Sequence, residues 1–309
     1  TDKLARLLAQ VLCLMMVAVI AFYFFSPSYV IDYSAHTGAW KGLSFEKNSF
    51  GEFMGIAVTL LLLVRFRHFP WLRYVFLAAA AVLLVLSHSA SALACCVMTI
   101  AIMPLWRWVR LNRQQRLLVC TASVLLFCAG VYFVVSHSGT LLTMLGRDST
   151  FTGRTQLWAA VWPAIMKRPV LGYGYDTFWA GLQGEVINTR ITAQWLAPAA
   201  DNGYIDLCLG LGFVGLFAFL YVFALVLRKA IQYIRFEPGS VGLWPVSYLC
   251  FYLAHSLSES VILRTGGLSS LLFAVLVTSL AMSRRNAVRA DRTAEAYQMA
   301  YAERPILAR

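Results

Sequence analysis

Long apolar runs separated by short basic clusters dominate the hydrophobic pattern of this chain. A helix needs about 20 largely apolar residues to cross a bilayer, and fewer when it is packed inside a bundle. The pattern therefore predicts an all-α fold, a polytopic membrane helical bundle with about eight spans. The expected spans are residues 6–25, 51–65, 73–87, 91–106, 117–135, 203–227, 241–257 and 266–282.

The composition agrees with a membrane protein. Hydrophobic residues make up 60% of the 309 residues and charged residues 13%, with a mean hydropathy of +0.69, whereas soluble domains carry about a quarter charged residues. The net charge of +12 lies in clusters between apolar runs, which indicates contact with membrane lipids and disfavours nucleic acid as a partner. The seven cysteines lie in or beside apolar runs, without the spacing of a metal site or a disulfide framework.

The basic clusters also predict an orientation. The positive-inside rule places the N-terminus, alternate loops and a basic tail at 283–309 on the cytoplasmic side. Residues 1–282 then form the membrane domain. The first apolar run is too long for a signal-peptide core and has no small-residue cleavage site after it, and the chain begins at Thr1 without methionine. We therefore interpret the run as a true span of an N-terminally truncated protein. The segments expected on the outer, periplasmic side are 26–50, 87–91, 136–202 and 257–265.

The periplasmic loop 136–202 is the longest interval that is not apolar. Thr152 is a predicted N-cap, and apolar residues then recur at helical spacing until Pro169, which predicts a Trp-rich helix lying in the membrane interface. Gly172 and Gly174, in a Gly-Tyr-Gly-Tyr segment, predict a turn whose backbone approaches another group closely. The apolar residues of the predicted helix are Leu157, Trp158, Val161, Trp162 and Ile165.

Basic residues on the outer side run against the positive-inside rule, so their presence there needs a separate explanation. Arg147, Arg154 and Arg264 stand among Gly, Ser and Thr near predicted helix ends, where a guanidinium fork can bind phosphate. Asp201 is either the N-cap of the sixth span or a general base at the mouth of a cavity. Glu259 is either a salt-bridge partner that orients Arg264 or a helix cap.

The remaining chemical signals are weak. P-loops, nucleotide fingerprints and zinc-protease motifs are absent from the sequence, so we expect no cofactor, no metal and no coupling to ATP. Four histidines fall on the outer side, and each is either a proton acceptor or a structural hydrogen-bonding residue: His36, His88, His137 and His255.

Five linked motifs in a fixed order make the sequence resemble the O-antigen ligase and polysaccharide polymerase family, and within it the exopolysaccharide-production (ExoQ-like) branch. The resemblance covers about residues 38 to 265. The motifs are W-K-G-L-S-x-x-K-N-x-x-G from Trp40 to Gly51, with an S-x-S turn at Ser87 and Ser89, D-x-T-x-T-G-R-T-x-L-W from Asp148, P-V-L-G-Y-G-Y-x-x-F-W from Pro169, D-N-G-Y-I-D-L-x-L-x-L-G-F-V-G-L from Asp201, and S-E-S from Ser258.

The resemblance implies an inner-membrane, multi-pass glycosyltransferase with its active site facing the periplasm. Such an enzyme takes a glycan carried on undecaprenyl diphosphate and transfers it to another glycan or to a lipid A core, without a metal or a nucleotide sugar. The family role of the arginine in the Thr-Gly-Arg-Thr segment carries to Arg154. Members usually have further N-terminal spans, about 10 to 12 spans in all, which fits the interpretation of this chain as truncated.

One departure from the family bears on the mechanism. Many ligases carry a histidine, assigned as the base, just before the Asn-Gly-Tyr segment, where this chain has Ala199 and Asp201. Either Asp201 replaces the histidine, or no base is required because the diphosphate is a good leaving group once the acceptor hydroxyl is positioned.

The resulting hypothesis is an inverting displacement at the anomeric carbon. Arg154, helped by Arg264 or Arg147, would hold the diphosphate, and Asp201 would accept the proton. The other expected substrate-binding residues are Lys47, Glu259 and Asn202 together with the aromatic Tyr173, Tyr175, Trp179 and Tyr204, which would offer stacking faces for sugars.

Two other classes of function stay open. A transporter or flippase for a lipid-linked glycan would carry charged residues in the middle of its spans, where this sequence has almost none. A structural subunit of a polysaccharide-export complex would depend on no single polar residue.

Overall fold

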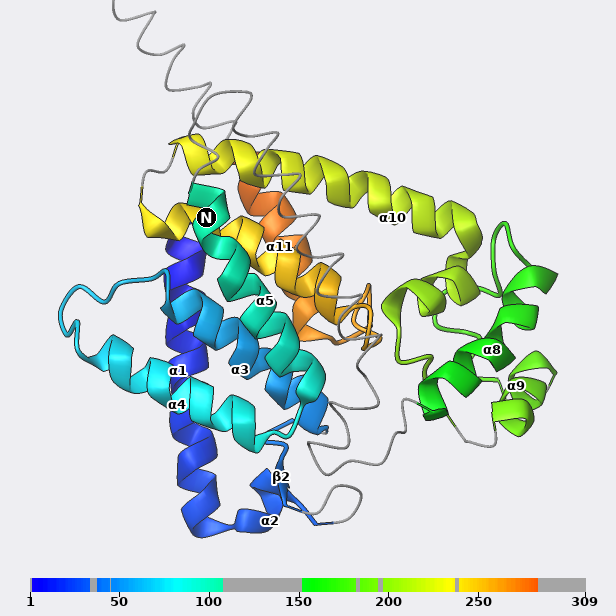
Figure 1. The fold of residues 1–309 in the computed structure, drawn as a ribbon, viewed down its shortest axis with the longest axis horizontal. Helices are drawn as coiled ribbons and strands as arrows, with labels where there is room; N and C mark the ends of the chain where they lie inside the picture. The colour runs from blue at the N-terminus through cyan, green and yellow to red at the C-terminus, as the bar shows by residue number, and fades with distance from the viewer. Residues whose placement is uncertain are drawn as a thin grey trace, which may run out of the picture.

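The computed structural model describes residues 2–33, 38–44, 46–107, 152–181, 184–193, 197–236 and 239–282. The predicted span 117–135, Arg147 and the basic tail 283–309 lie outside these residues. Figure 1 shows a helical bundle that contains α1, α3, α4, α5 and α11, a second lobe formed around α8 and α9, and the long α10 joining the two.

Helices form nearly all of the regular structure in the described ranges, so the predicted helical class is confirmed. A single antiparallel pair of two-residue strands interrupts them, with Ile31 opposite Trp40. The elements in chain order are α1 (Asp2–Phe25), α2 (Pro27–Val30), β1 (Ile31–Asp32), β2 (Ala39–Trp40), α3 (Lys47–Leu61), α4 (Leu72–Leu86), α5 (Ala90–Arg107), α8 (Thr152–Lys167), α9 (Glu185–Ala193), α10 (Gly203–Phe236), the 3-10 helix η2 (Ser240–Leu243), α11 (Trp244–His255) and the helix Leu268–Met282.

Two of the described helices, α1 and α10, are long and apolar enough to cross a membrane. Both carry large apolar side chains on their outer surfaces, among them Leu14 at 70% exposure and Phe217 at 65%. An apolar surface of this extent is unfavourable in water and favourable in lipid. The helices Leu72–Leu86 and Leu268–Met282 are apolar but shorter. The number of spans stays a prediction.

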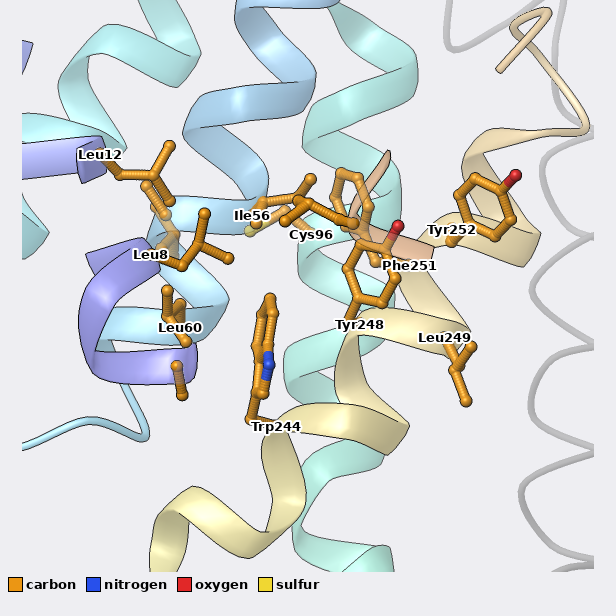
Figure 2. Close-up of a cluster of buried hydrophobic side chains, with 14 of the residues drawn as sticks. Leu8, Leu12, Ile56, Leu60, Cys96, Trp244, Tyr248, Leu249, Phe251 and Tyr252 are labelled. Carbon is orange, nitrogen blue, oxygen red and sulfur yellow. The ribbon is translucent and has the colours of Figure 1, made fainter. Parts of the chain in front are cut away.

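The centre of the bundle is α3, whose residues from Met54 to Leu61 are all buried. Figure 2 shows Ile56 and Leu60 of this helix between Leu8 and Leu12 of α1 and the aromatic residues of α11. Gly55 allows α11 to approach α3 closely, because a Cβ atom there would lie 2.8 Å from the Phe251 ring. Full burial of an apolar helix explains why its short hydrophobic run forms a stable element.

A buried polar cluster joins three helices near one end of this bundle. The Ser269 hydroxyl donates a hydrogen bond to Glu52 Oε1, and His255 Nδ1 lies 3.8 Å from the same oxygen. Glu52 stands in the second turn of α3 and His255 is the last residue of α11. These ionisable groups therefore lie near helix ends rather than at the middle of a span.

The long α10 is broken at Gly212, which has φ 65° and ψ −169°, a conformation that is essentially restricted to glycine. The break leaves backbone groups without helical partners, and the loop after α8 supplies them. Tyr173 N–H donates to the Leu209 carbonyl at 2.8 Å, and Phe213 N–H donates to the Pro169 carbonyl at 2.7 Å. The Gly-Tyr-Gly-Tyr turn thus approaches the backbone of α10, and this is the close contact that its glycines permit.

The predicted helix in the loop exists as α8, but most of its apolar residues face protein. Leu157, Val161 and Ile165 are buried in a second core together with Phe178 and Leu209. The expectation that this apolar face lies in the membrane interface is therefore wrong for these three residues, because the following loop and α9 fold over them. Trp162 is 55% exposed.

Candidate functional site

Arg154, in the first turn of α8, lies between two carboxylates from distant parts of the chain. Its Nε is 3.4 Å from Asp201 Oδ2, and its Nη2 is 3.0 Å from Glu259 Oε1. The three side chains are 25%, 26% and 12% exposed, respectively. The guanidinium fork therefore joins two acids at a partly solvated position, where charged hydrogen bonds are stronger than at an open surface.

Asp201 is held in place by its backbone neighbours. The Trp158 indole N–H donates to the Ala200 carbonyl at 2.8 Å, and Ala200 N–H donates to Asp206 Oδ1 at 3.1 Å. Asp201 itself has φ 51°, a left-handed conformation that is uncommon for residues other than glycine, asparagine and aspartate. In this conformation the Asp201 carboxylate lies next to the Arg154 guanidinium.

The structure assigns the N-terminal cap of α10 to Asn202 and not to Asp201. Asn202 Oδ1 accepts hydrogen bonds from Tyr204 N–H at 3.0 Å and Ile205 N–H at 3.2 Å. Its amide group donates to the Leu257 carbonyl at 3.1 Å. Asn202 therefore has a capping role, whereas the Asp201 carboxylate contacts Arg154. That either residue binds substrate or acts as a base stays a prediction.

The capping role makes a first prediction. Replacement of Asn202 by alanine should lower the free energy of unfolding by about 1 kcal/mol, the usual loss for an N-cap. Replacement of Asp201 by asparagine should leave stability nearly unchanged, because asparagine tolerates the same backbone conformation. Thermal unfolding in detergent measures both variants. Equal losses in the two would contradict the assignment of the cap.

Glu259 follows α11 in a short turn and is largely buried. Asn48 Nδ2 donates to Glu259 Oε1 at 2.8 Å, the same oxygen that contacts Arg154. Burial raises the pKa of this carboxyl from 4.5 to about 7, Arg154 opposes the rise and Asp201 adds to it. Glu259 was expected to pair with Arg264 or to cap a helix. Its partner is instead Arg154, which α8 brings to it across the loop.

The raised pKa of Glu259 predicts how stability depends on pH. Between pH 4.5 and about 7 the folded protein keeps a proton that the unfolded chain has released. Stability should therefore fall as the pH rises through this window and level off above it. Glu259→Gln stays neutral and should show a shallower fall, measured by thermal unfolding at pH about 5 and about 8. If the stability of wild type and variant fell equally with rising pH, Glu259 would not be the source of the pH dependence.

A cavity of about 340 Å³ opens beside the two carboxylates. Its lining comes from the loop after α8, from the segment before α10 and the first turns of α10, and from the turns that follow α11. Its size is at the lower end of small-ligand pockets. Three predicted site residues line it in addition to Asp201 and Glu259, namely Tyr175, Trp179 and Arg264. Arg264 is exposed.

Asp206 is a cavity residue that sequence reasoning missed. Its carboxylate accepts the Trp179 indole N–H at 2.7 Å and the Ser260 hydroxyl, besides Ala200 N–H. It therefore fixes the aromatic ring of Trp179 and the segment before Asp201 at once. An acid inside an apolar span is a signal that could have identified it. Asn48 was missed because it gave no comparable signal.

Three other predicted site residues lie away from the lining. The Tyr173 hydroxyl donates to the Ala164 carbonyl at 2.9 Å, and its ring packs on Phe178. The Tyr204 hydroxyl donates to the Leu253 carbonyl at 2.9 Å. Both rings pack within the protein and do not offer the expected stacking faces. Lys47 begins α3 beside Asn48 and is not a lining residue.

Metal ligands do not gather in the described part of the chain, where no group of three or more His, Cys, Asp or Glu residues could hold an ion.

Comparisons with known proteins agree with the motifs. Residues 75–220 match the protein-family model described as O-antigen ligase. The chain is also 28% identical over 151 residues to the exopolysaccharide production protein ExoQ of Rhizobium meliloti (strain 1021). This match covers 46% of the chain and 34% of the relative, so the chain spans about a third of the length of the curated protein it matches. Both findings confirm the resemblance to the O-antigen ligase family and its exopolysaccharide-production branch.

Proposed function

We propose that this chain, similar to O-antigen ligases and to an exopolysaccharide production protein, takes part in joining polysaccharide units at the bacterial inner membrane. The donor is a glycan on undecaprenyl diphosphate, and the acceptor is another glycan or a lipid A core. The reaction occurs on the periplasmic side. One observation carries the proposal: Arg154, Asp201 and Glu259, far apart in sequence, meet beside a cavity lined by aromatic and acidic side chains.

The site has two sides. Asp201 and Glu259 line the cavity, whereas Arg154 contacts both and is not itself a lining residue. The two carboxylates thus link the guanidinium to the cavity lining. We assign the diphosphate to Arg154 and the acceptor to the cavity. This arrangement suits displacement with inversion, because the acceptor oxygen attacks the anomeric carbon from the face opposite to the departing diphosphate.

The bonds change as follows. The acceptor oxygen forms a bond to the anomeric carbon while the bond from that carbon to the diphosphate oxygen breaks. The diphosphate leaves with the electron pair, and Arg154 stabilises its charge. The proton of the acceptor hydroxyl passes to the Asp201 carboxylate, a general base in position at the cavity wall.

Glu259 has a role in freeing the arginine. In the structure Arg154 already contacts two carboxylates, so an incoming diphosphate competes with them. A carboxyl with a pKa of about 7 can take up a proton near neutral pH and release Arg154 Nη2 to the phosphate. The arriving anion favours that protonation, because like charges raise the pKa of an acid.

The test of this function is the Asp201→Asn variant in the full-length protein, reconstituted with an undecaprenyl-diphosphate oligosaccharide. Loss of a general base usually lowers the rate by about 10²- to 10⁴-fold, while shape and backbone conformation are kept. Release of undecaprenyl diphosphate and growth of the glycan are measured with glycan and lipid A core acceptors in parallel. Wild-type turnover in the variant would show that Asp201 is not the base.

A lipid-linked glycan transporter is the second candidate function, because buried ionisable groups such as Glu52 and His255, which lie 3.8 Å apart, are a feature of transporters. The pair lies near the ends of its helices and close to the proposed site, rather than at mid-span where translocation paths are marked. In the same reconstituted system, movement of intact donor across the bilayer without release of diphosphate would favour transport. Unchanged polymer with every site variant would favour a structural subunit.

A further inference from the structure

The charge of the cavity wall points to the kind of glycan that the cavity accepts. Among the described residues that line it, carboxylates outnumber cations strongly, because the one basic lining residue is Arg264 at the exposed edge. Arg154 is not a lining residue and already contacts two of the acids. The acidic lining residues are Glu46, Asp176, Asp201, Asp206 and Glu259.

An anionic group inside this cavity would be opposed by several acids at once. A cleft of opposite charge attracts a charged ligand, whereas a cleft of like charge repels it. A diphosphate, a uronic acid or a phosphorylated sugar is therefore disfavoured here. Sugar hydroxyl groups, by contrast, are donors, and ionised carboxylates are strong acceptors for them.

The apolar part of the lining fits a sugar as well. Tyr175, Phe178 and Trp179 come from one turn after α8 and line the same cavity. Two of these rings are fixed in place, since the Trp179 indole donates to Asp206 and the Tyr175 hydroxyl donates to the Leu263 carbonyl. Rigid aromatic side chains give a large contact area with little loss of side-chain entropy on binding.

We propose that this cavity is the acceptor subsite and that it selects glycans without negative charge. The proposal rests on the function proposed above and adds the chemical class of the acceptor. The donor diphosphate stays at Arg154. Arg264 lies at the cavity edge and Arg154 contacts two of the five acidic lining residues, so acidic groups still outnumber the cations around the cavity.

The experiment compares two acceptors that differ only in charge. One is the neutral glycan released from the donor lipid, and the other is the same glycan with its primary hydroxyls oxidised to carboxylates. Each is added to the full-length reconstituted protein, and transfer to it is measured as labelled product at increasing acceptor concentration. The neutral glycan should be used at least about tenfold more efficiently at low ionic strength, and the ratio should shrink at high salt.

A variant at the cavity edge tests the cause of this preference. Asp176 is exposed, has φ 55° and accepts the Thr265 hydroxyl at 3.2 Å, and Asp176→Asn keeps both the shape and that hydrogen bond. It should reduce the discrimination several-fold. Glu185 on α9 is not a lining residue, and Glu185→Gln removes its charge while it keeps an acceptor for Lys167. This control variant should leave the discrimination unchanged.

The outcomes separate this inference from the function it rests on. If both glycans are used equally, or the oxidised glycan is used better, the proposed selectivity for neutral acceptors is wrong. The proposed function still holds in that case, provided that the donor is turned over. Discrimination that is unaffected by Asp176→Asn, or equally affected by Glu185→Gln, also overturns it. Failure of wild type to release diphosphate with any acceptor overturns the function itself.

Discussion

Replacement of Arg154 by lysine is expected to lower glycan transfer by at least about a hundredfold, even though the charge is kept. The guanidinium contacts Asp201 through Nε and Glu259 through Nη2. A single ammonium on a flexible stem cannot hold both carboxylates and then present a fork to a diphosphate. Release of undecaprenyl diphosphate and growth of labelled glycan measure the loss.

A second arginine of the same lobe is the control for Arg154. Arg168 lies 5.0 Å from the centroid of the Tyr173 ring and outside the cavity, so Arg168→Lys should keep nearly full activity. Thermal unfolding in detergent should be similar for the two lysine variants. If Arg154→Lys transfers glycan at the wild-type rate, neither the fork geometry nor the assigned role of Arg154 is correct.

Replacement of Gly212 by alanine should be the most destabilising single change in the joint between α10 and the loop after α8. The conformation is restricted to glycine, and a Cβ atom would lie 2.2 Å from the Val170 carbonyl oxygen. Strain in such a conformation is about 1–3 kcal/mol, and the clash of backbone with backbone adds to it. We expect a total loss of roughly 3 kcal/mol or more, a fall in Tm on the order of 10 °C.

Gly184 separates the two contributions. It has φ 72°, and a Cβ atom there would meet nothing within 4 Å. Gly184→Ala should therefore lose only the strain of the left-handed conformation, about 1–2 kcal/mol. Gly172→Ala, with a Cβ atom 2.5 Å from the Leu209 carbonyl oxygen, should resemble Gly212→Ala. If all three variants lost the same small amount of stability, the predicted backbone clash would be wrong, because the loop could move away from α10.

The joint also explains why activity should respond to Gly212. The backbone hydrogen bonds from Tyr173 and Phe213 fix the loop against α10, and the same lobe carries Arg154 on α8. A shift of the lobe would move Arg154 relative to Asp201 and Glu259. Displacements of about 1 Å at a site can lower rates by a hundredfold, so transfer should fall more than the change in stability alone explains.

The positions of the helices were largely predictable from the sequence, because long apolar runs can satisfy their backbone groups in lipid only as helices. The expected spans 51–65, 73–87 and 91–106 correspond to α3, α4 and α5, with ends that differ by a few residues. The turn at Gly172 was also predictable, because glycine allows that backbone conformation and a close approach to another backbone segment. The segment that it approaches, in α10, was not predictable.

The partners of the charged residues were decided by tertiary structure. A sequence shows that Asp201 and Asn202 precede a helix, but either can cap it, and the choice depends on which side chain reaches the first N–H groups. The sequence likewise shows that Arg264, five residues after Glu259, is nearer to it along the chain than Arg154. Packing of α8 over the loop brings Arg154 to Glu259 instead, across a separation of 105 residues.

The sequence by itself therefore determined the helical class, the apolar helices and most of the residue types in the site, because these follow from local periodicity and chemistry. Only the tertiary structure decided that α8 faces protein through Leu157 and Val161, that α10 breaks at Gly212, and that Asp206 holds Trp179. The physical reason is that each depends on groups brought together by folding, and their burial and hydrogen bonding have no signature in local sequence.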